Sequence, residues 1–357
     1  MFIVGPNASG KSNFLDVFRL LKDIAKSGGG LQKAVMDDRG GISKIRNLAA
    51  RKSPAVEIGV NMYDPIEKSN WIYELAFRWK SEFPTQLEIA KENVKKDGAL
   101  LLNRPDSDDA QDPRLLTQTS IEQISANKNF RQVAEYFSSI QYRHLVPQLV
   151  KYTTISNGLG ASEDPFGRSF LQQVATTNKK TKDARLRKIE HALNIAVPQL
   201  EHLTDIRDEF GNPHLEAIYR HWRPDAGKQR EDQFSDGTLR LIGLLWTILE
   251  SDGLLLLEEP ELSLHDAIIS KLPSLMHRIN SKKSQMIIST HSAALLSDKG
   301  IGAEEILLLS PSSEGTEAKL ARDIATVRLL LEKGMSPADA VIPISAPENV
   351  EQLVLFS

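Results

Sequence analysis

GPNASGKS, residues 5–12, follows four residues that are mainly apolar at the start of the chain. It matches the phosphate-binding loop pattern G-x-x-x-x-G-K-[ST] at every fixed position. Gly5 and Gly10 let backbone amides curl around an anion, and a helix that starts at Gly10 points its positive end at that anion. In such a loop Lys11 neutralises the β- and γ-phosphates of a nucleotide, and the Ser12 hydroxyl binds Mg²⁺. A chance glycine turn is the alternative, and the strand–turn–helix context disfavours it. The residues predicted to line the nucleotide are Gly5, Pro6, Asn7, Ala8, Ser9, Gly10, Lys11, Ser12 and Asn13.

The composition is that of an ordinary globular protein, with 357 residues, 41% of them hydrophobic and 25% charged. The net charge of -3 gives no overall attraction to nucleic acid, although a local basic face remains compatible with it. The absence of cysteine excludes disulfides, thiol catalysis and thiolate metal sites, and it fits a reducing compartment. The longest apolar run, LIGLLWTIL at 241–249, is about half a membrane span. We therefore expect a cytoplasmic protein without a membrane partner.

The apolar pattern predicts different structures in different parts of the chain. Residues 1–4 read as a buried strand, and Gly10 to Lys26 as an amphipathic helix. Residues 55–104 alternate between apolar and polar, which indicates a meander of antiparallel strands. The following stretch, to about residue 225, is mostly polar and helical in pattern, with a short strand near 140–145.

After residue 234 strands and helices alternate. The stretches GLLLLEEP (253–260), SQMIIST (284–290) and EEILLLS (304–310) predict buried strands. SDGTLRLIGLLWTILES (235–251) and LHDAIISKLPSLMHRIN (264–280) predict helices. Continuous apolar strands that alternate with helices indicate a parallel sheet covered on both faces. The sequence therefore predicts an α/β fold.

Two of these strands end in side chains that suit nucleotide chemistry. The strand at 254–261 ends in Glu258, a candidate magnesium ligand, and Glu259, a candidate general base. The strand before STHS (289–292) ends near His291, which could sense the γ-phosphate by hydrogen bonding. Taken alone, the acids are more often a solvated strand end, and His291 more often an ordinary histidine.

The stretch FSDGTLR (234–240) is the least specific of the four motifs, because Ser-Asp-Gly before a helix is a common capping arrangement. Its value lies in the order of parts. A phosphate loop is followed by a distant helix start at Ser235, Asp236 and Gly237, then by an acid-ended strand, and then by a strand that ends in histidine.

In this order and in these residues the chain resembles the ATP-binding cassette (ABC) ATPases. It is most similar to their SMC/RecF-like branch, which includes the ATPase domains of OLD-family and related anti-phage defence proteins. The resemblance rests on GPNASGKSN (5–13), SDGT (235–238) and EEPELSLH (258–265), with Leu264 and His265 in matching places. It covers residues 1–26 and about 230–309. It implies a P-loop ABC-ATPase head with a mixed or parallel sheet, an antiparallel β-meander and a helical insertion.

The resemblance also implies how the chain is divided. Residues 1–104 would form the first lobe of the ATPase head, with the phosphate loop and the meander. Residues 105–225 would form a mostly helical insertion that carries specificity for a partner or a nucleic acid. Residues 226–357 would complete the head.

A switching mechanism follows from the same resemblance. Two heads would form a homodimer, or a larger even-numbered assembly, around ATP and Mg²⁺. The loop of one head would face Ser235, Asp236 and Gly237 of the other. Hydrolysis at Glu259 would separate the heads and switch a separate effector protein, such as a nuclease, in nucleic-acid surveillance, DNA repair or phage defence.

The sequence departs from the family pattern at three points. Glu258 stands where most ABC ATPases have aspartate, as in the subgroup whose motif reads E-E-P-E. Gln141 and Gln148 qualify only by position for the glutamine of the Q-loop. The phosphate loop lies at the first residues of the chain, whereas related sequences carry further strands before it. We therefore expect a truncated or misplaced start, with an unpaired sheet edge and an incomplete base pocket.

Three other functions remain open. A nucleotide-binding subunit of a transporter belongs to the same class, but the long insertion and SDGT weigh against it. A scaffold that binds ATP without hydrolysing it is disfavoured by the intact Lys11, Ser12 and Glu259. Direct DNA binding through NKKTKDARLRK (178–188) is also possible, although a solvated helix face is the more common reason for such a charge run.

Overall fold

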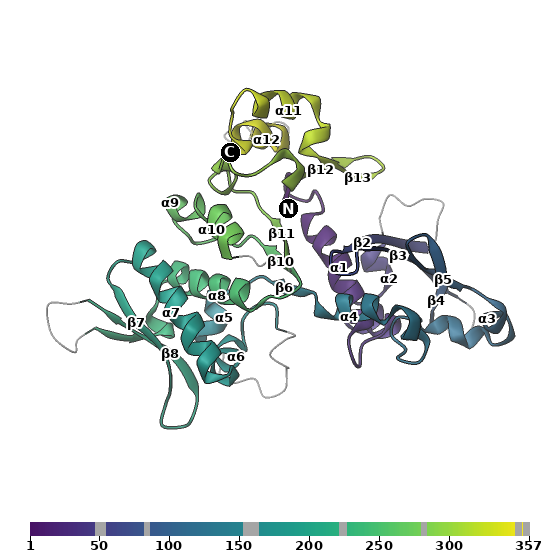
Figure 1. Cartoon of the computed structure of the whole chain (residues 1–357), viewed down its shortest axis with the longest axis horizontal. Coiled ribbons are helices and arrows are strands. Elements are labelled where there is room, and N and C mark those ends of the chain that lie inside the picture. Colours follow the sequence, from purple (N-terminus) through teal and green to yellow (C-terminus); the bar gives the residue numbers. More distant parts are fainter. Residues whose placement is uncertain are drawn as a thin grey trace. The chain divides into compact units, whose positions relative to one another are not determined.

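The computed structural model describes residues 1–46, 55–81, 86–152, 164–220, 227–279, 284–346 and residue 352 (Figure 1). The chain divides into two compact units. Unit 1 consists of Met1–Lys11, Gln141–Ser310 and Ala318–Ser357, and unit 2 of Ser12–Ile140 and Pro311–Glu317. The stretch predicted as one insertion, 105–225, contributes to both units, because the boundary between them falls after Ile140.

Unit 1 is built on a six-stranded sheet with the order β13-β12-β1-β11-β10-β6. The strands are β1 (Phe2–Val4), β6 (Gln141–Arg143), β10 (Leu254–Glu258), β11 (Gln285–Ser289), β12 (Ile306–Ser312) and β13 (Gly315–Leu320). Strand β1 pairs in parallel with β11 and β12, and β10 pairs in parallel with β11 and β6. The expected unpaired edge beside the first strand is therefore not found. The carboxyl ends of β1, β10 and β11 meet at one edge of the sheet.

Most predicted helices of unit 1 are present, but one is divided. The helices are α5 (Pro147–Tyr152), α6 (Phe170–Thr176), α7 (Lys179–Ala196), α8 (Asp236–Glu250), α9 (Asp266–Ile269), α10 (Leu272–Ile279), α11 (Ala325–Glu332) and α12 (Pro337–Ser345). The single helix expected over 264–280 is wrong, because Pro273 cannot donate a backbone hydrogen bond to a preceding turn. The helix is interrupted at residues 270–271, between α9 and α10. Among the described helices, none combines the length and the hydrophobicity that crossing a membrane requires.

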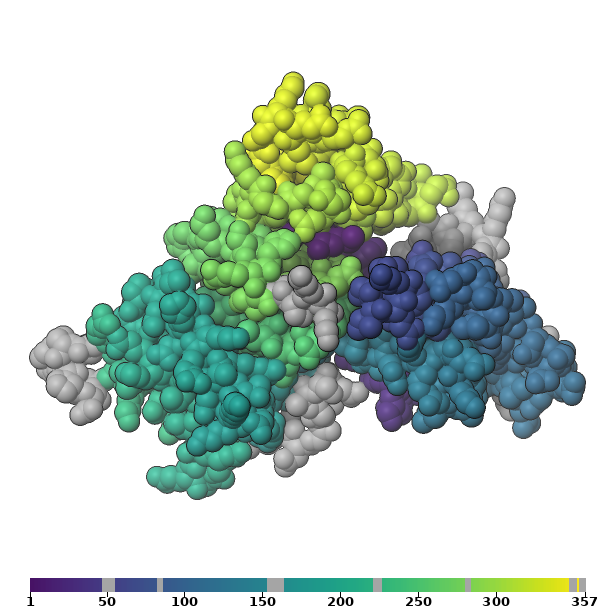
Figure 2. Space-filling model, viewed as in Figure 1, coloured from purple at the N-terminus to yellow at the C-terminus, as the bar shows by residue number. Residues whose placement is uncertain are grey.

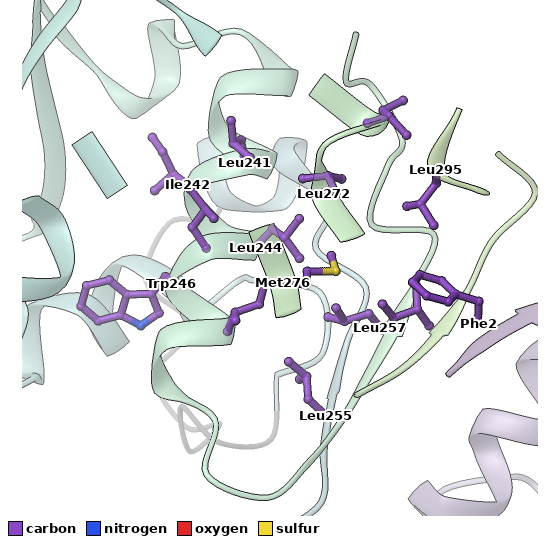
Figure 3. Close-up of a cluster of buried hydrophobic side chains, with 14 of the residues drawn as sticks. Phe2, Leu241, Ile242, Leu244, Trp246, Leu255, Leu257, Leu272, Met276 and Leu295 are labelled. Atoms are coloured by element: carbon purple, nitrogen blue, oxygen red, sulfur yellow. The ribbon is translucent and has the colours of Figure 1, made fainter. Parts of the chain in front are cut away.

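Helix α8 forms the centre of the hydrophobic core of unit 1 (Figure 3). All of its residues from 238 to 248 are buried. Figure 3 shows Ile242, Leu244 and Trp246 of α8 in the same cluster as Leu257 of β10 and Met276 of α10. A helix that is apolar on all sides is stable only when other elements surround it. The burial of α8 therefore fixes the position of its first turn relative to β10.

Unit 1 also contains a small antiparallel sheet that the sequence reading missed. It consists of β7 (Leu200–Arg207), β8 (Pro213–Tyr219) and β9 (Lys228–Arg230). Helix α7 packs against β7, and only Leu200 and Leu203 of β7 and alternate positions of β8 such as Leu215 are buried, so the stretch reads as polar. In Figure 2 the teal residues of α6, α7, β7 and β8 form one continuous mass.

Unit 2 contains the antiparallel meander, as predicted from residues 55–104. Its strands are β2 (Ala55–Asp64), β3 (Ser69–Lys80), β4 (Gln86–Lys96) and β5 (Ala99–Arg104), in that order. Its helices are α1 (Lys11–Ala25), whose first residue belongs to unit 1, α2 (Ile42–Ile45), α3 (Ser107–Gln111) and α4 (Arg131–Ser139).

A buried charge network holds the chain after β5 against the sheet of unit 2. Arg104 donates to Glu92 on β4 at 3.1 Å and to Asp109 on α3 at 2.7 Å. The Glu92 side chain is fully buried and also accepts the backbone amides of Ser120 and Ile121. One arginine therefore compensates two carboxylates that come from different elements.

We predict that Arg104→Met lowers the free energy of unfolding by about 3–5 kcal/mol, because it leaves Glu92 buried without a countercharge. Urea unfolding followed by circular dichroism measures the change. Lys91→Met is the matched control, since the pair of Lys91 with Glu74 is half-exposed and contributes about 1 kcal/mol or less. Equal losses in the two variants would contradict the role assigned to the buried network.

Candidate nucleotide site

The phosphate-loop sequence forms a tight turn between β1 and α1. A Cβ atom on Gly5 would lie 2.4 Å from the carbonyl oxygen of Leu309 on β12, so only glycine fits. Ala8 and Gly10 have positive φ angles of 61° and 90°, which turn successive amides toward the inside of the loop. The loop therefore has the backbone shape that an anion requires.

Lys11 lies inside this turn. Its ammonium group donates to the carbonyl oxygens of Gly5 and Pro6, both at 2.9 Å, and the side chain is buried. Burial lowers the pKa of Lys11, and the negative charges of Glu259 and Glu258 oppose that shift. The lysine and both acids are thus close enough to interact electrostatically. Ser12 and Asn13 follow Lys11 on α1, in unit 2.

Glu259 follows β10 in an unusual backbone conformation. Its φ angle is 43°, in the left-handed region that costs a non-glycine residue about 1–2 kcal/mol. Its backbone amide donates to the carbonyl oxygen of Ser289 at 3.0 Å, which holds the turn against β11. Strain of this kind is common where a side chain must point in one direction for chemistry.

His291 is positioned beside Glu259 by the end of β11. Its Nε2 atom lies 3.5 Å from Glu259 Oε1. Burial and the charge of Lys11 lower the pKa of His291, while Glu259 opposes the shift. The shift favours the neutral ring, in which one nitrogen donates and the other accepts.

Two buried charged residues near these acids received no role in the sequence reading. Glu261 accepts a hydrogen bond from Thr290 at 2.5 Å, and burial raises the pKa of its carboxyl. Arg240 on α8 is buried and interacts electrostatically with Glu261, Asp236 and Glu259. Both residues lie within the quoted motifs, but a sequence does not distinguish an exposed acid at a strand end, or an exposed arginine on a helix, from a buried one. Only their burial distinguishes them.

The start of α8 is held by several contacts. Ser235 caps the helix by accepting the backbone amide of Thr238 at 3.1 Å. A Cβ on Gly237 would lie 2.6 Å from the carbonyl oxygen of Ser263, so glycine is required there by packing alone. Asp236 accepts from Gln148 at 2.5 Å and from Lys151 at 2.7 Å.

The two glutamines considered for the Q-loop lie elsewhere. Gln148 contacts the start of α8, and Gln141 pairs with Leu255 at the opposite end of β10 from its acids. Instead, Tyr142 and His144 from the same segment contact Glu258. This could not be found from the sequence, because it depends on the register between β6 and β10.

The residues present fit a nucleotide with Mg²⁺. The backbone turn and Lys11 suit phosphate oxygens, and the Glu258 carboxylate could supply oxygen ligands within unit 1. Within the described ranges, no group of three or more His, Asp or Glu side chains could hold a metal by itself. Mg²⁺ is commonly bound by one or two protein oxygens together with phosphates and water, and this donor set is of that kind.

Comparisons with known proteins agree with this geometry. Residues 1–297 match the family described as "AAA domain, putative AbiEii toxin, Type IV TA system". The "Old nuclease" of Escherichia phage P2 is 28% identical over 179 residues, which is 44% of this chain and 30% of that relative. The chain therefore spans less than a third of the length of that curated relative.

A solved structure supports this fold. An SMC head bound to the C-terminal winged-helix domain of ScpA is similar, with a TM-score of 0.52 and 16% identity over 89% of each chain. The SMC head domain from Thermotoga maritima gives a TM-score of 0.42 and 15% identity, also over 89% of each chain. At 16% identity the first likeness concerns the fold alone, a P-loop α/β head.

We predict that Lys151→Met increases the hydrogen-exchange rate of the first amides of α8 about fivefold, because the Lys151–Asp236 pair contributes about 1 kcal/mol to holding that turn. Exchange read by mass spectrometry on peptides that cover residues 234–242 measures it. Lys188→Met, at an exposed lysine of α7, is the control and should leave these amides unchanged. Unchanged exchange in Lys151→Met would show that α8 holds its first turn without α5.

Proposed function

The chain belongs to the AAA-domain family matched by residues 1–297, and from this premise we propose that it binds ATP with Mg²⁺ and hydrolyses it as an SMC/RecF-like ABC ATPase. The observation that carries the proposal is that Lys11, in the loop after β1, and Glu258 and Glu259, at the end of β10, lie at one edge of the parallel sheet. A phosphate loop alone occurs in proteins with many activities. A strained acid beside the loop lysine favours hydrolysis over simple binding.

Each residue has a definite role in this proposal. The loop amides and Lys11 bind the β- and γ-phosphates, and Ser12 and Glu258 hold Mg²⁺, which neutralises charge that develops on the phosphates. Glu259 accepts a proton from a water that attacks the γ-phosphorus, while the bond to the β–γ bridging oxygen breaks. His291 donates a hydrogen bond to the γ-phosphate. The products are ADP and inorganic phosphate.

We further propose that ATP joins two heads. Ser235 and Gly237 of one copy would complete the site of the other, because the start of α8 offers backbone amides and a hydroxyl to an anion. Hydrolysis would then release the dimer and switch a separate effector. The name of the curated relative, a nuclease, supports a nuclease as that effector, with phage defence or nucleic-acid surveillance as the process.

Direct DNA binding by the 178–188 stretch is less well supported by the contacts of α7. Arg185 pairs with Glu250 at 3.3 Å and lies over the Trp246 ring, and Lys182 pairs with Asp205 at 2.5 Å. Part of this basic charge is therefore already neutralised within unit 1. DNA contact is accordingly not part of the proposed function.

We predict that Glu259→Gln lowers ATP turnover at least about 100-fold, because it removes the general base. The same variant should accumulate an ATP-dependent dimer, measured by light scattering in the same samples. Lys11→Ala should neither turn over nor dimerise. Glu209→Gln, at an exposed acid on the β7–β8 turn, is the control and should behave as the parent.

Two outcomes would change the proposal. A parent that dimerises with ATP but shows no turnover would be a scaffold that does not hydrolyse ATP. If the Glu259→Gln variant hydrolyses ATP as fast as the parent, the general base lies elsewhere, and Glu261 is the first residue to test.

A further inference from the structure

Strand β6 brings a tyrosine to the candidate magnesium carboxylate. The register pairs Tyr142 with Leu256, so Tyr142 lies on the same face of the sheet as Glu258, two residues further along β10. Two residues of strand span about 6.6 Å, close to the length of a tyrosine side chain. The Tyr142 hydroxyl donates to Glu258 Oε2. Sheet register and side-chain length therefore produce this contact together.

The backbone of Glu258 is held from the same segment. Nδ1 of His144 lies 3.1 Å from the Glu258 carbonyl oxygen, which can only accept, so Nδ1 carries the proton in this contact. The His144 and Phe166 rings pack edge to face, with their centroids 6.2 Å apart and their planes at 87°. This contact keeps the imidazole in place. Residue 258 is thus fixed at its carbonyl group and at its carboxylate.

A longer acid needs such support more than a shorter one. Glutamate has one more rotatable bond than aspartate, so its carboxylate samples more positions unless a neighbour restricts it. A carboxylate has two oxygens and about four lone-pair sites, so one hydrogen bond from Tyr142 orients the group and leaves it able to bind a metal or a metal-bound water. Glutamate at 258 and tyrosine at 142 form a matched pair.

We propose that Tyr142 is a positioning residue for Mg²⁺: it sets the rotamer of Glu258 and thereby the affinity for the magnesium that accompanies ATP. The inference rests on the proposed nucleotide site and adds a residue that none of the sequence motifs contains. Partners that orient metal ligands typically contribute 10–100-fold to metal affinity.

The test measures magnesium dependence without turnover. The β,γ-imido analogue of ATP is added to the full chain, and the rise in Tm is titrated with Mg²⁺ for the parent and for Tyr142→Phe, Glu258→Asp and the double variant. Tyr142→Phe is expected to raise the half-saturating Mg²⁺ concentration about tenfold. Glu258→Asp should raise it similarly, because its shorter carboxylate no longer reaches the hydroxyl. The double variant should bind Mg²⁺ no more weakly than Glu258→Asp alone.

Controls separate this inference from a purely structural role. Tyr136→Phe, at another partly buried tyrosine, on α4, should leave the Mg²⁺ titration unchanged. A Tyr142→Phe variant with lower Tm but an unchanged half-saturating Mg²⁺ concentration would overturn the positioning role. The positioning role would also be overturned if the fold-changes in half-saturating Mg²⁺ of the two single variants multiplied in the double variant. Should Tyr142→Phe fail to fold, an unchanged titration in Glu258→Asp would likewise overturn it.

The proposed function fails in a different way. A parent that shows no rise in Tm with the analogue, with or without Mg²⁺, has no nucleotide site, and the Tyr142 inference then falls with it. A parent stabilised by the analogue equally in Mg²⁺ and in EDTA keeps the nucleotide site but loses the magnesium role of both Glu258 and Tyr142.

Discussion

The close approach of Gly5 to the backbone of β12 is the constraint on which the candidate site depends. Strand β1 lies between β11 and β12, and the chain leaves it at a residue that has no room for a side chain. The phosphate loop must therefore turn at this point. Parallel pairing places the ends of β10 and β11 at the same edge of the sheet, and so the acids and His291 arrive beside Lys11. Parallel strand pairing and the lack of space at Gly5 thus assemble the site from segments almost 300 residues apart.

Each of the two units is stabilised by a different kind of interaction. In unit 1 the apolar helix α8 is surrounded on all sides, so the start of that helix is fixed by burial and by contacts from α5. In unit 2 the Arg104 network links β4 to the chain that follows β5. Such a network is sensitive to the loss of one partner, because the remaining charges have no access to water.

Much of the fold could be predicted from local pattern. A residue motif, an apolar periodicity or an apolar run marks several elements in the sequence. These are the phosphate loop, the four-stranded meander, the strand at β6 and helix α8. The β7–β8 hairpin was missed because a sheet with one covered face shows few apolar residues. The break between α9 and α10 was missed although Pro273 marks it.

The site was predictable only where chemistry is carried by consecutive residues. Gly5 to Ser12 and the acids at the end of β10 could be named from their spacing, and their catalytic roles remain proposals. Tyr142, His144 and the link from Lys151 to Asp236 could not, because each depends on which residue lies opposite another across the fold. The same holds for Arg240 and Glu261, whose burial no motif reveals.

The left-handed backbone at Glu259 has an evolutionary consequence. Glycine or asparagine would occupy that conformation with less strain than glutamate does. Selection for a stable fold and selection for a carboxylate therefore oppose each other at this one position. In a lineage that no longer needed the carboxylate, mutation would tend to replace it with one of those two residues, and the identity of residue 259 would record whether the chemistry was still in use.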